Sequence, residues 1–211
     1  MKTLTIQQTK EMLLAVAQAV IAQVPRLTEV DSVIGDGDHG VGMGGGMEKA
    51  REALHKLDAP ADINALYKAM GMAMLNSMGG ASGVIFGTMF LGGVKGAPSS
   101  TLLDCATLRT MTRKSLDSIK ERGQAQVGDK TMVDAYEPAV LAMEAYTGDD
   151  LGEMLDKAAV AAEEGVERTK NYVAKFGRAR YLGERAIGHQ DAGATSVSII
   201  MAAMRDYVKG L

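Results

Sequence analysis

Three closely spaced aspartates are the residues in this sequence with the most evident chemistry. Asp31, Asp36 and Asp38 fall within eight residues, and their carboxylates repel one another unless a cation neutralises them. Oxygen ligands in a segment without cysteine suit Mg²⁺ or Ca²⁺. The three positions do not share one face of a continuous helix, but Gly35 and Gly37 permit a sharp corner that brings them round one point. The structural alternative is a solvated turn in which an aspartate caps a helix.

A glycine-rich run continues directly from the aspartates. Seven glycines lie between positions 35 and 46. Bare backbone N–H groups at a helix start bind phosphate oxygens, and Mg²⁺ bridges phosphates to carboxylates. An EF-hand is excluded because its twelfth position is Met47 instead of a bidentate glutamate, and a Rossmann loop is excluded because no strand precedes the run. The acidic cluster and the glycine run together therefore predict a metal–phosphate site.

Two further glycine turns open helices. The turn at 79–83 fits an anion at a helix N-terminus and fits close helix packing equally well. The segment 123–131 is spelled like a P-loop, but Asp129 separates Gly128 from Lys130 and a helix precedes the segment. We interpret the spelling as a coincidence, although the loop still offers polar groups at a helix start.

A long polar segment precedes the last predicted helix. Residues 177–195 are irregular and rich in glycine, a length of loop that indicates function in a compact domain. Arg178, Arg180 and Arg185 could meet phosphates, whereas an isolated arginine is more often part of a surface ion pair. Asp191 is placed to cap the last helix.

The remainder of the chain predicts helices joined by short loops. Alanine and methionine are abundant, aromatic residues make up only 4%, and no stretch alternates with period two. Thr5 and Gln8 form a capping box, Asp62 and Asp150 are further N-caps, and Pro25 ends the first helix. Helices are predicted at about 5–24, 45–57, 62–77, 82–95, 101–121, 132–146, 150–175 and 194–209. Short loops between about eight helices predict antiparallel neighbours in a bundle or a closed ring.

Bulk composition limits the class of protein. The 211 residues fit one domain spanning 1–211, large enough to form a core without disulfides. The net charge of -3 provides no basic footprint for nucleic acid or for an acidic membrane. Cys105 is alone, so it forms no internal disulfide, and a buried packing role is expected for it. No targeting or membrane-spanning segment is visible, which predicts a soluble cytoplasmic protein.

Four segments carry a resemblance to a known family. They are IGDGDHG (34–40), GGASG with the following FGT (79–88), GDKTM (128–132) and GRARYLGERAIGHQDAGATS (177–196). In this order and spacing the chain resembles the L subunit of dihydroxyacetone kinase, a domain that also forms the C-terminus of single-chain dihydroxyacetone kinases.

The resemblance implies a fold and a set of site residues. The expected fold is all-α, an eight-helix antiparallel up-and-down barrel with a nucleotide, ADP or ATP, at one end. Two Mg²⁺ ions are expected on Asp31, Asp36 and Asp38. The expected nucleotide contacts are His39, Gly40, Val41, Gly42, Ala81, Ser82, Gly123, Met132, Arg178, Asp191, Ala192 and Gly193.

The resemblance also implies a division of labour. In the family, a separate K subunit holds the ketose covalently on its own histidine, and the L domain presents the phosphoryl group. In one branch, ADP stays bound and is rephosphorylated in place by a phosphohistidine on an M subunit. A free-standing L chain favours that branch.

Several alternatives stay open at this stage. They are a subunit that uses free ATP, with dihydroxyacetone or a four-carbon ketose such as erythrulose as substrate, a nucleotide-dependent regulatory protein that binds a transcription regulator, and a fatty-acid kinase-like relative. The sequence also leaves open whether the chain forms a homodimer.

Overall fold

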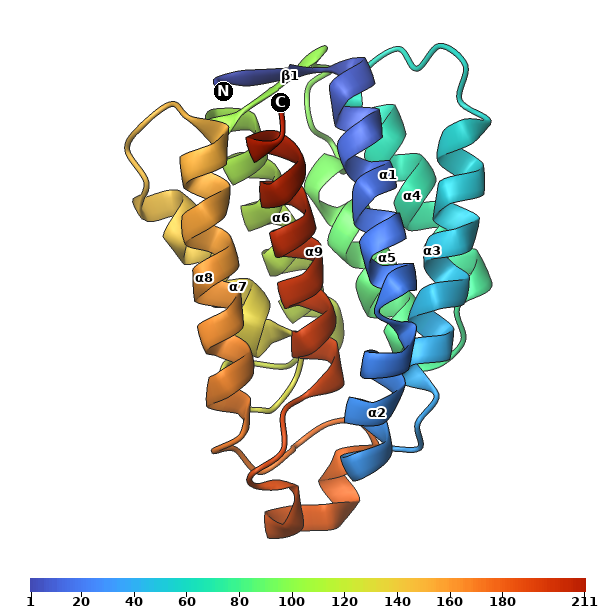
Figure 1. The fold of residues 1–211 in the computed structure, drawn as a ribbon, viewed down its shortest axis with the longest axis vertical. Coiled ribbons are helices and arrows are strands. Elements are labelled where there is room, and N and C mark those ends of the chain that lie inside the picture. Colours follow the sequence, from blue (N-terminus) through green and yellow to red (C-terminus); the bar gives the residue numbers. More distant parts are fainter.

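The computed structural model describes residues 1–211 and is dominated by helices that run alternately up and down (Figure 1). The elements in chain order are β1 (Thr3–Thr5), α1 (Ile6–Ala22), α2 (Val24–Ile34), α3 (His39–His55), α4 (Ile63–Ser77), α5 (Gly80–Val94), β2 (Leu102–Asp104), α6 (Cys105–Gly123), α7 (Val133–Ala145), α8 (Leu151–Thr169), the 3₁₀ helix η1 (Arg178–Ala186) and α9 (Ala192–Lys209).

Eight of the helices form a closed ring. Each helix from α3 to α9 packs on the next α-helix in the chain, and α1 closes the ring by contacting both α9 and α3. The expected eight-helix antiparallel barrel is therefore confirmed, with α2 and η1 added at one end (Figure 1). Because neighbours are antiparallel, α3, α5, α7 and α9 all begin at this same end.

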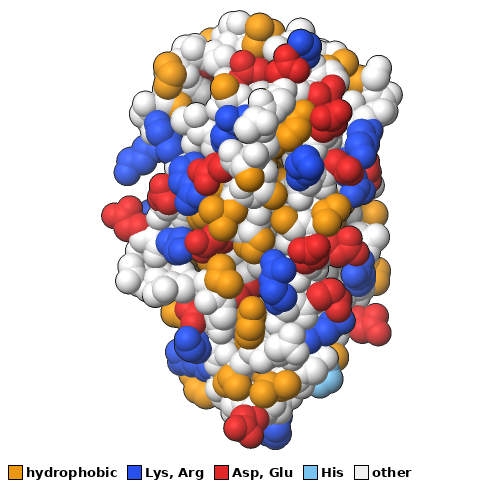
Figure 2. Space-filling model, turned by 90° about the vertical axis from the view of Figure 1, so that its left-hand side faces the viewer, with side chains coloured by type: hydrophobic (Ala, Val, Ile, Leu, Met, Phe, Trp, Pro, Cys, Tyr) orange, Lys and Arg blue, Asp and Glu red, His pale blue; other side chains and the backbone are white.

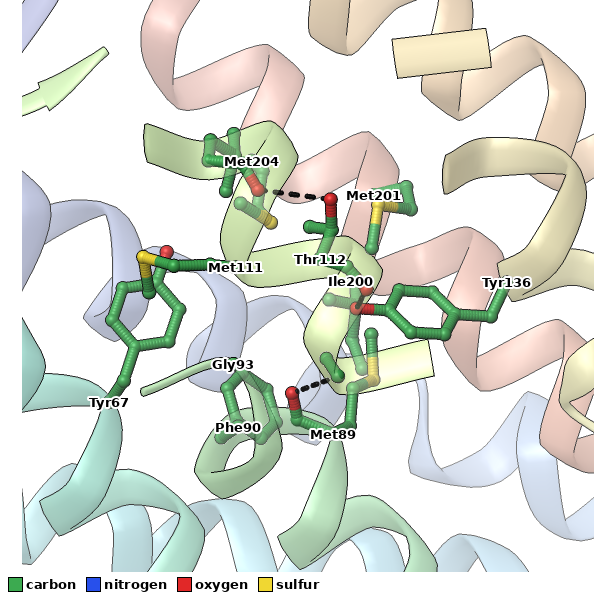
Figure 3. A pocket seen from close by; sticks show the side chains of 12 residues that line it. Tyr67, Met89, Phe90, Gly93, Met111, Thr112, Tyr136, Ile200, Met201 and Met204 are labelled. Atoms are coloured by element: carbon green, nitrogen blue, oxygen red, sulfur yellow. Dashed lines mark hydrogen bonds between the residues drawn. The ribbon is translucent and has the colours of Figure 1, made fainter. Parts of the chain in front are cut away.

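The inside of the ring is apolar. A cluster of 48 buried residues joins the helices, and α1 contributes Met12, Leu13 and Val16 at helical spacing. A cavity of about 30 Å³ remains among apolar and hydroxyl side chains that include Tyr67, Tyr136 and others drawn in Figure 3. None of its lining residues is charged, so the charged chemistry of this protein must lie elsewhere.

The opposite end of the ring and its outer surface show no concentration of charged or reactive side chains like that at the end with α2. A two-stranded antiparallel sheet pairs Leu4 with Leu103 at the end away from α2, which agrees with the prediction of little or no sheet. Cys105 is 5% exposed, as expected for a packing residue. Acidic and basic side chains are interspersed over the face in Figure 2. No single helix combines the length and the apolar composition needed to cross a membrane.

Four helix starts were predicted correctly: the side chains of Thr5, Asp62, Asp150 and Asp191 accept N-terminal capping hydrogen bonds. The helix predicted from 101 begins instead at Cys105, after β2, and Asp104 is its N-cap.

Two predictions about the first third of the chain were wrong. Pro25 does not end the helical region but lies in the first turn of α2, where its missing N–H costs nothing, and α1 and α2 meet at a 55° bend. Helix α3 begins at His39 instead of near 45, so the glycine run is itself helical. Asp31 therefore projects from a helix, and the glycines form the first turns of the next helix.

The closest helix packing gives a stability prediction. A Cβ on Gly165 in α8 would lie 2.7 Å from the Cα of Ala135 in α7, whereas a Cβ on Gly45 in α3 would meet nothing within 4 Å. We expect Gly165→Ala to destabilise the protein by about 1–3 kcal/mol through overpacking. The matched control Gly45→Ala should be neutral or should stabilise by about 0.5–1 kcal/mol, since alanine favours helix. Urea unfolding measures both; equal midpoints for Gly165→Ala and wild type would contradict the packing described here.

Candidate metal and phosphate site

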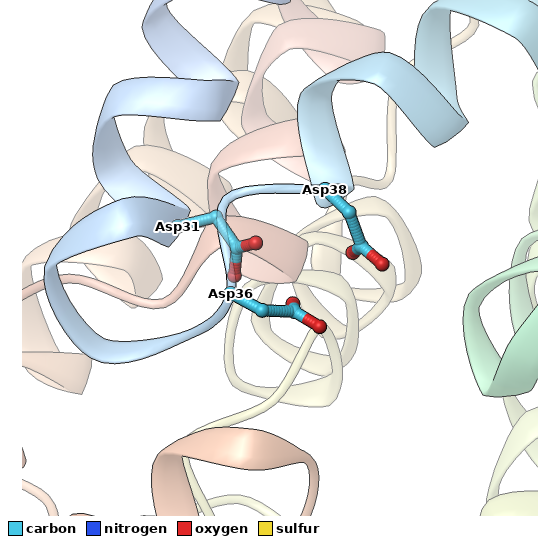
Figure 4. A group of neighbouring side chains, drawn as sticks. All are labelled: Asp31, Asp36 and Asp38. Carbon is cyan, nitrogen blue, oxygen red and sulfur yellow. The ribbon is translucent and has the colours of Figure 1, made fainter.

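The three aspartates meet at the corner between α2 and α3. Asp31 lies in the last turn of α2, Asp36 lies in the corner, and Asp38 directly precedes α3 (Figure 4). One carboxylate oxygen from each lies within 4.8 Å of the others. The corner depends on Gly37, whose φ of +77° is accessible mainly to glycine, as the sequence predicted.

The carboxylates are not used as helix caps. Asp38 occupies the N-cap position of α3 but its side chain makes no capping hydrogen bond. Asp31 Oδ2 accepts a hydrogen bond from the backbone N–H of His39 at 3.2 Å, and Asp36 Oδ2 pairs with Arg178 Nε at 2.5 Å. Burial, together with the charges of Asp36 and Asp31, raises the pKa of Asp38. Crowded carboxylates with free oxygens are the ligands that a hard divalent cation prefers.

The glycines of α3 serve two purposes. A Cβ on Gly40 would lie 2.6 Å from the backbone N of Thr28, and a Cβ on Gly44 would lie 2.6 Å from Val24 Cγ2. These two glycines therefore let α3 pack tightly on α2, which holds the two sides of the acidic corner together. Gly42 is different, because a Cβ there would meet nothing within 4 Å. Its own N–H donates to Asp38 O at 2.9 Å, but the space beside its Cα is open, next to the first-turn N–H groups of Gly40 and Val41.

Helix starts converge beside the acidic corner. The buried ring of His39, the first residue of α3, lies 5.9 Å from the ring of Phe86 in α5. Its Nε2 lies 2.8 Å from Ser196 Oγ in α9. These contacts bring the first turn of α3 against the second turns of α5 and α9, so the N-terminal ends of three helices, with their partial positive charges, lie at one end of the ring (Figure 1). Positive helix ends next to a cluster of carboxylates suit phosphate groups that carry divalent cations.

The His39 side chain is used for packing between helices. Burial lowers the pKa of His39, although Asp31 and Asp38 oppose the shift, so the imidazole is neutral at pH 7. With its Nε2 bonded to Ser196, the ring fastens α3 to α9. The sequence singled out His39 as a nucleotide contact; in this structure its backbone N–H faces Asp31 and its ring faces the helices.

The remaining sequence-predicted residues line the same end of the ring. Ala81 and Ser82 are in the first turn of α5, which begins at Gly80. Met132 directly precedes α7, and a Cβ on Gly193 in α9 would lie 3.4 Å from Met132 Cβ. Gly123 ends α6, and a Cβ there would lie 3.1 Å from Ile85 Cδ1. Small and apolar surfaces therefore lie at the same end of the ring as the acidic corner.

The long segment 177–195 is only partly as expected. Arg178 reaches the acidic corner. Arg180 instead bonds to the hydroxyl of Tyr181 and lies 4.7 Å over its ring, and Arg185 Nε donates to Leu182 O at 3.4 Å. Part of the segment forms η1. Only one of the three arginines is thus brought to the site.

Asp191 joins this segment to α9. Its carboxylate accepts a hydrogen bond from the N–H of Ala194 at 2.7 Å, and its own N–H donates to Thr169 Oγ1 at 3.0 Å. Burial raises the pKa of Asp191 to about 7, against the effect of the Ala194 hydrogen bond. A carboxyl that titrates near neutrality thus caps the helix whose first turn borders the site.

The sequence did not predict the residues that His39 and Gly123 contact on neighbouring helices. Phe86 and Ser196 fasten His39 in place, and Ile85 faces Gly123. Phe86 and Ser196 fall inside the segments FGT and GATS that carried the resemblance. The sequence therefore identified the segments that contain Phe86 and Ser196, but it did not predict that both residues contact His39.

Comparison with known proteins identifies the family. The model of the DAK2 domain matches residues 33–206, and the chain belongs to this family. The resemblance seen in the sequence is thereby confirmed.

Individual relatives match over most of the chain. The ADP-binding subunit DhaL of the PEP-dependent dihydroxyacetone kinase of Escherichia coli is 41% identical over 177 residues, which cover 83% of this chain and 84% of the relative. The corresponding subunit of the PTS-dependent enzyme of Lactococcus lactis is 34% identical over 97% of this chain and 99% of the relative.

A solved structure shares the fold. The dihydroxyacetone kinase from C. freundii, in complex with AMP-PNP and Mg²⁺, matches with a TM-score of 0.73 and 25% identity. The match covers 94% of this chain and 33% of the kinase, so this chain corresponds to about a third of that protein.

The acidic corner gives a metal-binding prediction. We expect Asp38→Asn to weaken Mn²⁺ binding at least tenfold, because a free carboxylate oxygen of the cluster is lost. The control Asp156→Asn removes an exposed carboxylate on α8 that pairs with Lys209, and it should leave Mn²⁺ binding unchanged. Titration followed by Mn²⁺ electron paramagnetic resonance measures both, with circular dichroism to verify the helical fold. Equal Mn²⁺ affinity in Asp38→Asn and wild type would refute the metal site.

Proposed function

We propose that this chain is the nucleotide-binding subunit of a dihydroxyacetone kinase. It holds ADP or ATP with Mg²⁺ at the end of the ring where α3, α5, α7 and α9 begin, and it passes the phosphoryl group to a ketose bound on a separate K subunit. The observation that carries the proposal is the cluster of Asp31, Asp36 and Asp38 beside converging helix starts. Membership of the DAK2 family and the names of the relatives supply the nucleotide and the substrate class.

The metal ions belong on the three aspartates. Three carboxylates and a nucleotide diphosphate carry more negative charge than one divalent ion and Arg178 neutralise, which favours two Mg²⁺ ions. The donor set fits, because each aspartate offers an oxygen to the cluster, and Asp38, at the N-cap of α3, makes no capping hydrogen bond. Bound there, Mg²⁺ supplies charge neutralisation for phosphoryl transfer.

The nucleotide lies between the acidic corner and the other helix starts. The backbone N–H groups of Gly40 and Val41 face the phosphates, as do those of Ala192 and Gly193 at the start of α9. His39 and Gly42 border the phosphates on either side, while their own N–H groups bond to Asp31 and to Asp38 O. Arg178 exchanges its pairing with Asp36 for a phosphate oxygen.

Four more residues contact the nucleotide away from the metal ions. Ala81 and Ser82 border it at the start of α5. Gly123 and Met132 provide the small and apolar surface on which the base packs. Asp191 holds the first turn of α9 in place through its cap.

Phosphoryl transfer fits a site of this kind. Its transition state spreads charge over the oxygens of the transferred group, so catalysis rests on positioning and on electrostatic stabilisation. Cations on the aspartates and oriented N–H groups at helix starts supply both. No nucleophile is required from this chain, because the acceptor of the phosphoryl group is the ketose on the K subunit.

The phosphoryl donor is the phosphohistidine of an M subunit. The relatives in E. coli and L. lactis are named as PEP-dependent and PTS-dependent, and this chain covers most of their length. ADP then stays bound and is rephosphorylated in place. The alternative donor is free ATP, and the next experiment distinguishes the two.

Nucleotide retention tests the proposal. The chain is purified without added nucleotide and denatured, and the released compounds are analysed by chromatography, with exchange measured against labelled ATP. We expect stoichiometric ADP that exchanges slowly, because a bound phosphoryl carrier has no need to release it. A freely exchanging site would instead assign an ATP-using kinase subunit. Failure to bind any Mg-nucleotide would overturn the proposal.

A further inference from the structure

Lys130 is a buried lysine in the loop that was spelled like a P-loop. Its side chain is 2% exposed, and its Nζ donates hydrogen bonds to Thr169 O at 2.6 Å and to His189 O at 2.5 Å. A P-loop lysine extends towards phosphates, whereas this one points into the protein. The spelling was therefore a coincidence, as the sequence indicated, and the lysine needs a different explanation.

The backbone on both sides of Lys130 is fixed by two buried carboxylates. Asp134 accepts hydrogen bonds from the N–H groups of Gly128 at 2.6 Å and Thr131 at 2.7 Å. Asp129 accepts one from Gln126 at 2.8 Å. Lys130 itself has a φ of +59°, which a residue with a side chain adopts only where its surroundings enforce it. These hydrogen bonds hold the loop in one conformation, in which the ammonium group of Lys130 points into the protein. The loop leads directly into Met132 and α7.

The two carbonyls that Lys130 holds belong to the end of α8 and to the segment before α9. Thr169 ends α8, where a cation is favourable because helix C-termini carry partial negative charge. His189 precedes Asp191 by two residues, and Asp191 caps α9. Two other bonds fasten the same segment to the end of α8, from Gly188 N to Lys170 O at 2.7 Å and from Asp191 N to Thr169 Oγ1 at 3.0 Å. Lys130 supplies the only charged donor among these hydrogen bonds, and it links the junction to the loop that leads into α7.

We propose that Lys130 is a positioning residue for the nucleotide: it fixes the start of α9 at Asp191–Gly193 relative to Met132 at the start of α7, without touching the nucleotide itself. This inference rests on the proposed function, because those two helix starts are sides of the nucleotide site. The three aspartates lie on α2, on α3 and in the corner between them, and Lys130 Nζ bonds to none of them. Loss of the ammonium should therefore weaken nucleotide binding more than metal binding.

The test uses Lys130→Met in the full chain, which keeps the length of the side chain and removes its charge. Calorimetry with Mg-ADP and titration with Mn²⁺ alone measure the two affinities. We expect Mg-ADP to bind at least about tenfold more weakly, the usual effect of removing a group that orients others. Mn²⁺ affinity should change by less than about twofold, since its ligands are untouched. Lys130→Arg, which keeps donors at the junction, should recover part of the Mg-ADP affinity.

The matched control is Lys175→Met. Lys175 pairs with Asp129 in the same loop at 2.6 Å, but its side chain is 68% exposed. This variant should bind Mg-ADP like wild type. Amide hydrogen exchange of residues 187–193 should be faster in Lys130→Met and unchanged in Lys175→Met, a difference that a general loss of stability does not produce.

The outcomes separate this inference from the proposed function. Wild-type affinity for Mg-ADP in folded Lys130→Met would overturn the positioning role, as would equal losses of Mg-ADP and Mn²⁺ affinity. If Lys130→Met does not fold, Thr169→Val decides, because it removes the hydrogen bond that Asp191 N–H donates to Thr169 Oγ1, together with the one that Oγ1 donates to Val166 O within α8; unchanged Mg-ADP affinity there overturns the inference. Absence of Mg-ADP binding in wild type would instead refute the proposed function.

Discussion

Three carboxylates held close together at one corner repel one another, and the structure around them must both hold them in place and compensate their charge. Asp31, Asp36 and Asp38 are brought within 4.8 Å of one another, which is unfavourable without positive charge nearby. Gly37 makes the corner sharp, and Gly40 lets α3 lie against α2 so that the corner cannot open. The protein itself supplies only one cation to the cluster, Arg178. The remaining negative charge is what a divalent metal ion requires of a binding site.

The antiparallel ring supplies the complementary charge. Because successive helices alternate in direction, α3, α5, α7 and α9 present their N-termini at one end, the end that carries the acidic corner (Figure 1). A nucleotide phosphate chain fits between these two features, since it binds both metal ions and backbone N–H groups. The inside of the ring is apolar and provides stability, so structure and chemistry are separated along its axis.

Local signals in the sequence predicted the local features well. Capping residues marked the starts of α1, α4, α8 and α9, and the alternation of glycine and aspartate predicted the corner at 35–38. Pro25 was misleading because proline is compatible both with the end of one helix and with the first turn of the next. The glycine run looked like a loop because glycine disfavours helix, but close packing of α3 on α2 requires it. The contact of His39 with Ser196 was not predictable, since it joins residues 157 positions apart.

The most direct test is a crystal structure of the chain with ADP and Mn²⁺, with the metal located by its anomalous scattering. We expect manganese peaks coordinated by Asp31, Asp36 and Asp38. We also expect phosphates between these ions and the first turns of α3 and α9, with the base packed beside Met132. Manganese elsewhere, or a nucleotide bound away from the converging helix starts, would contradict the proposed site.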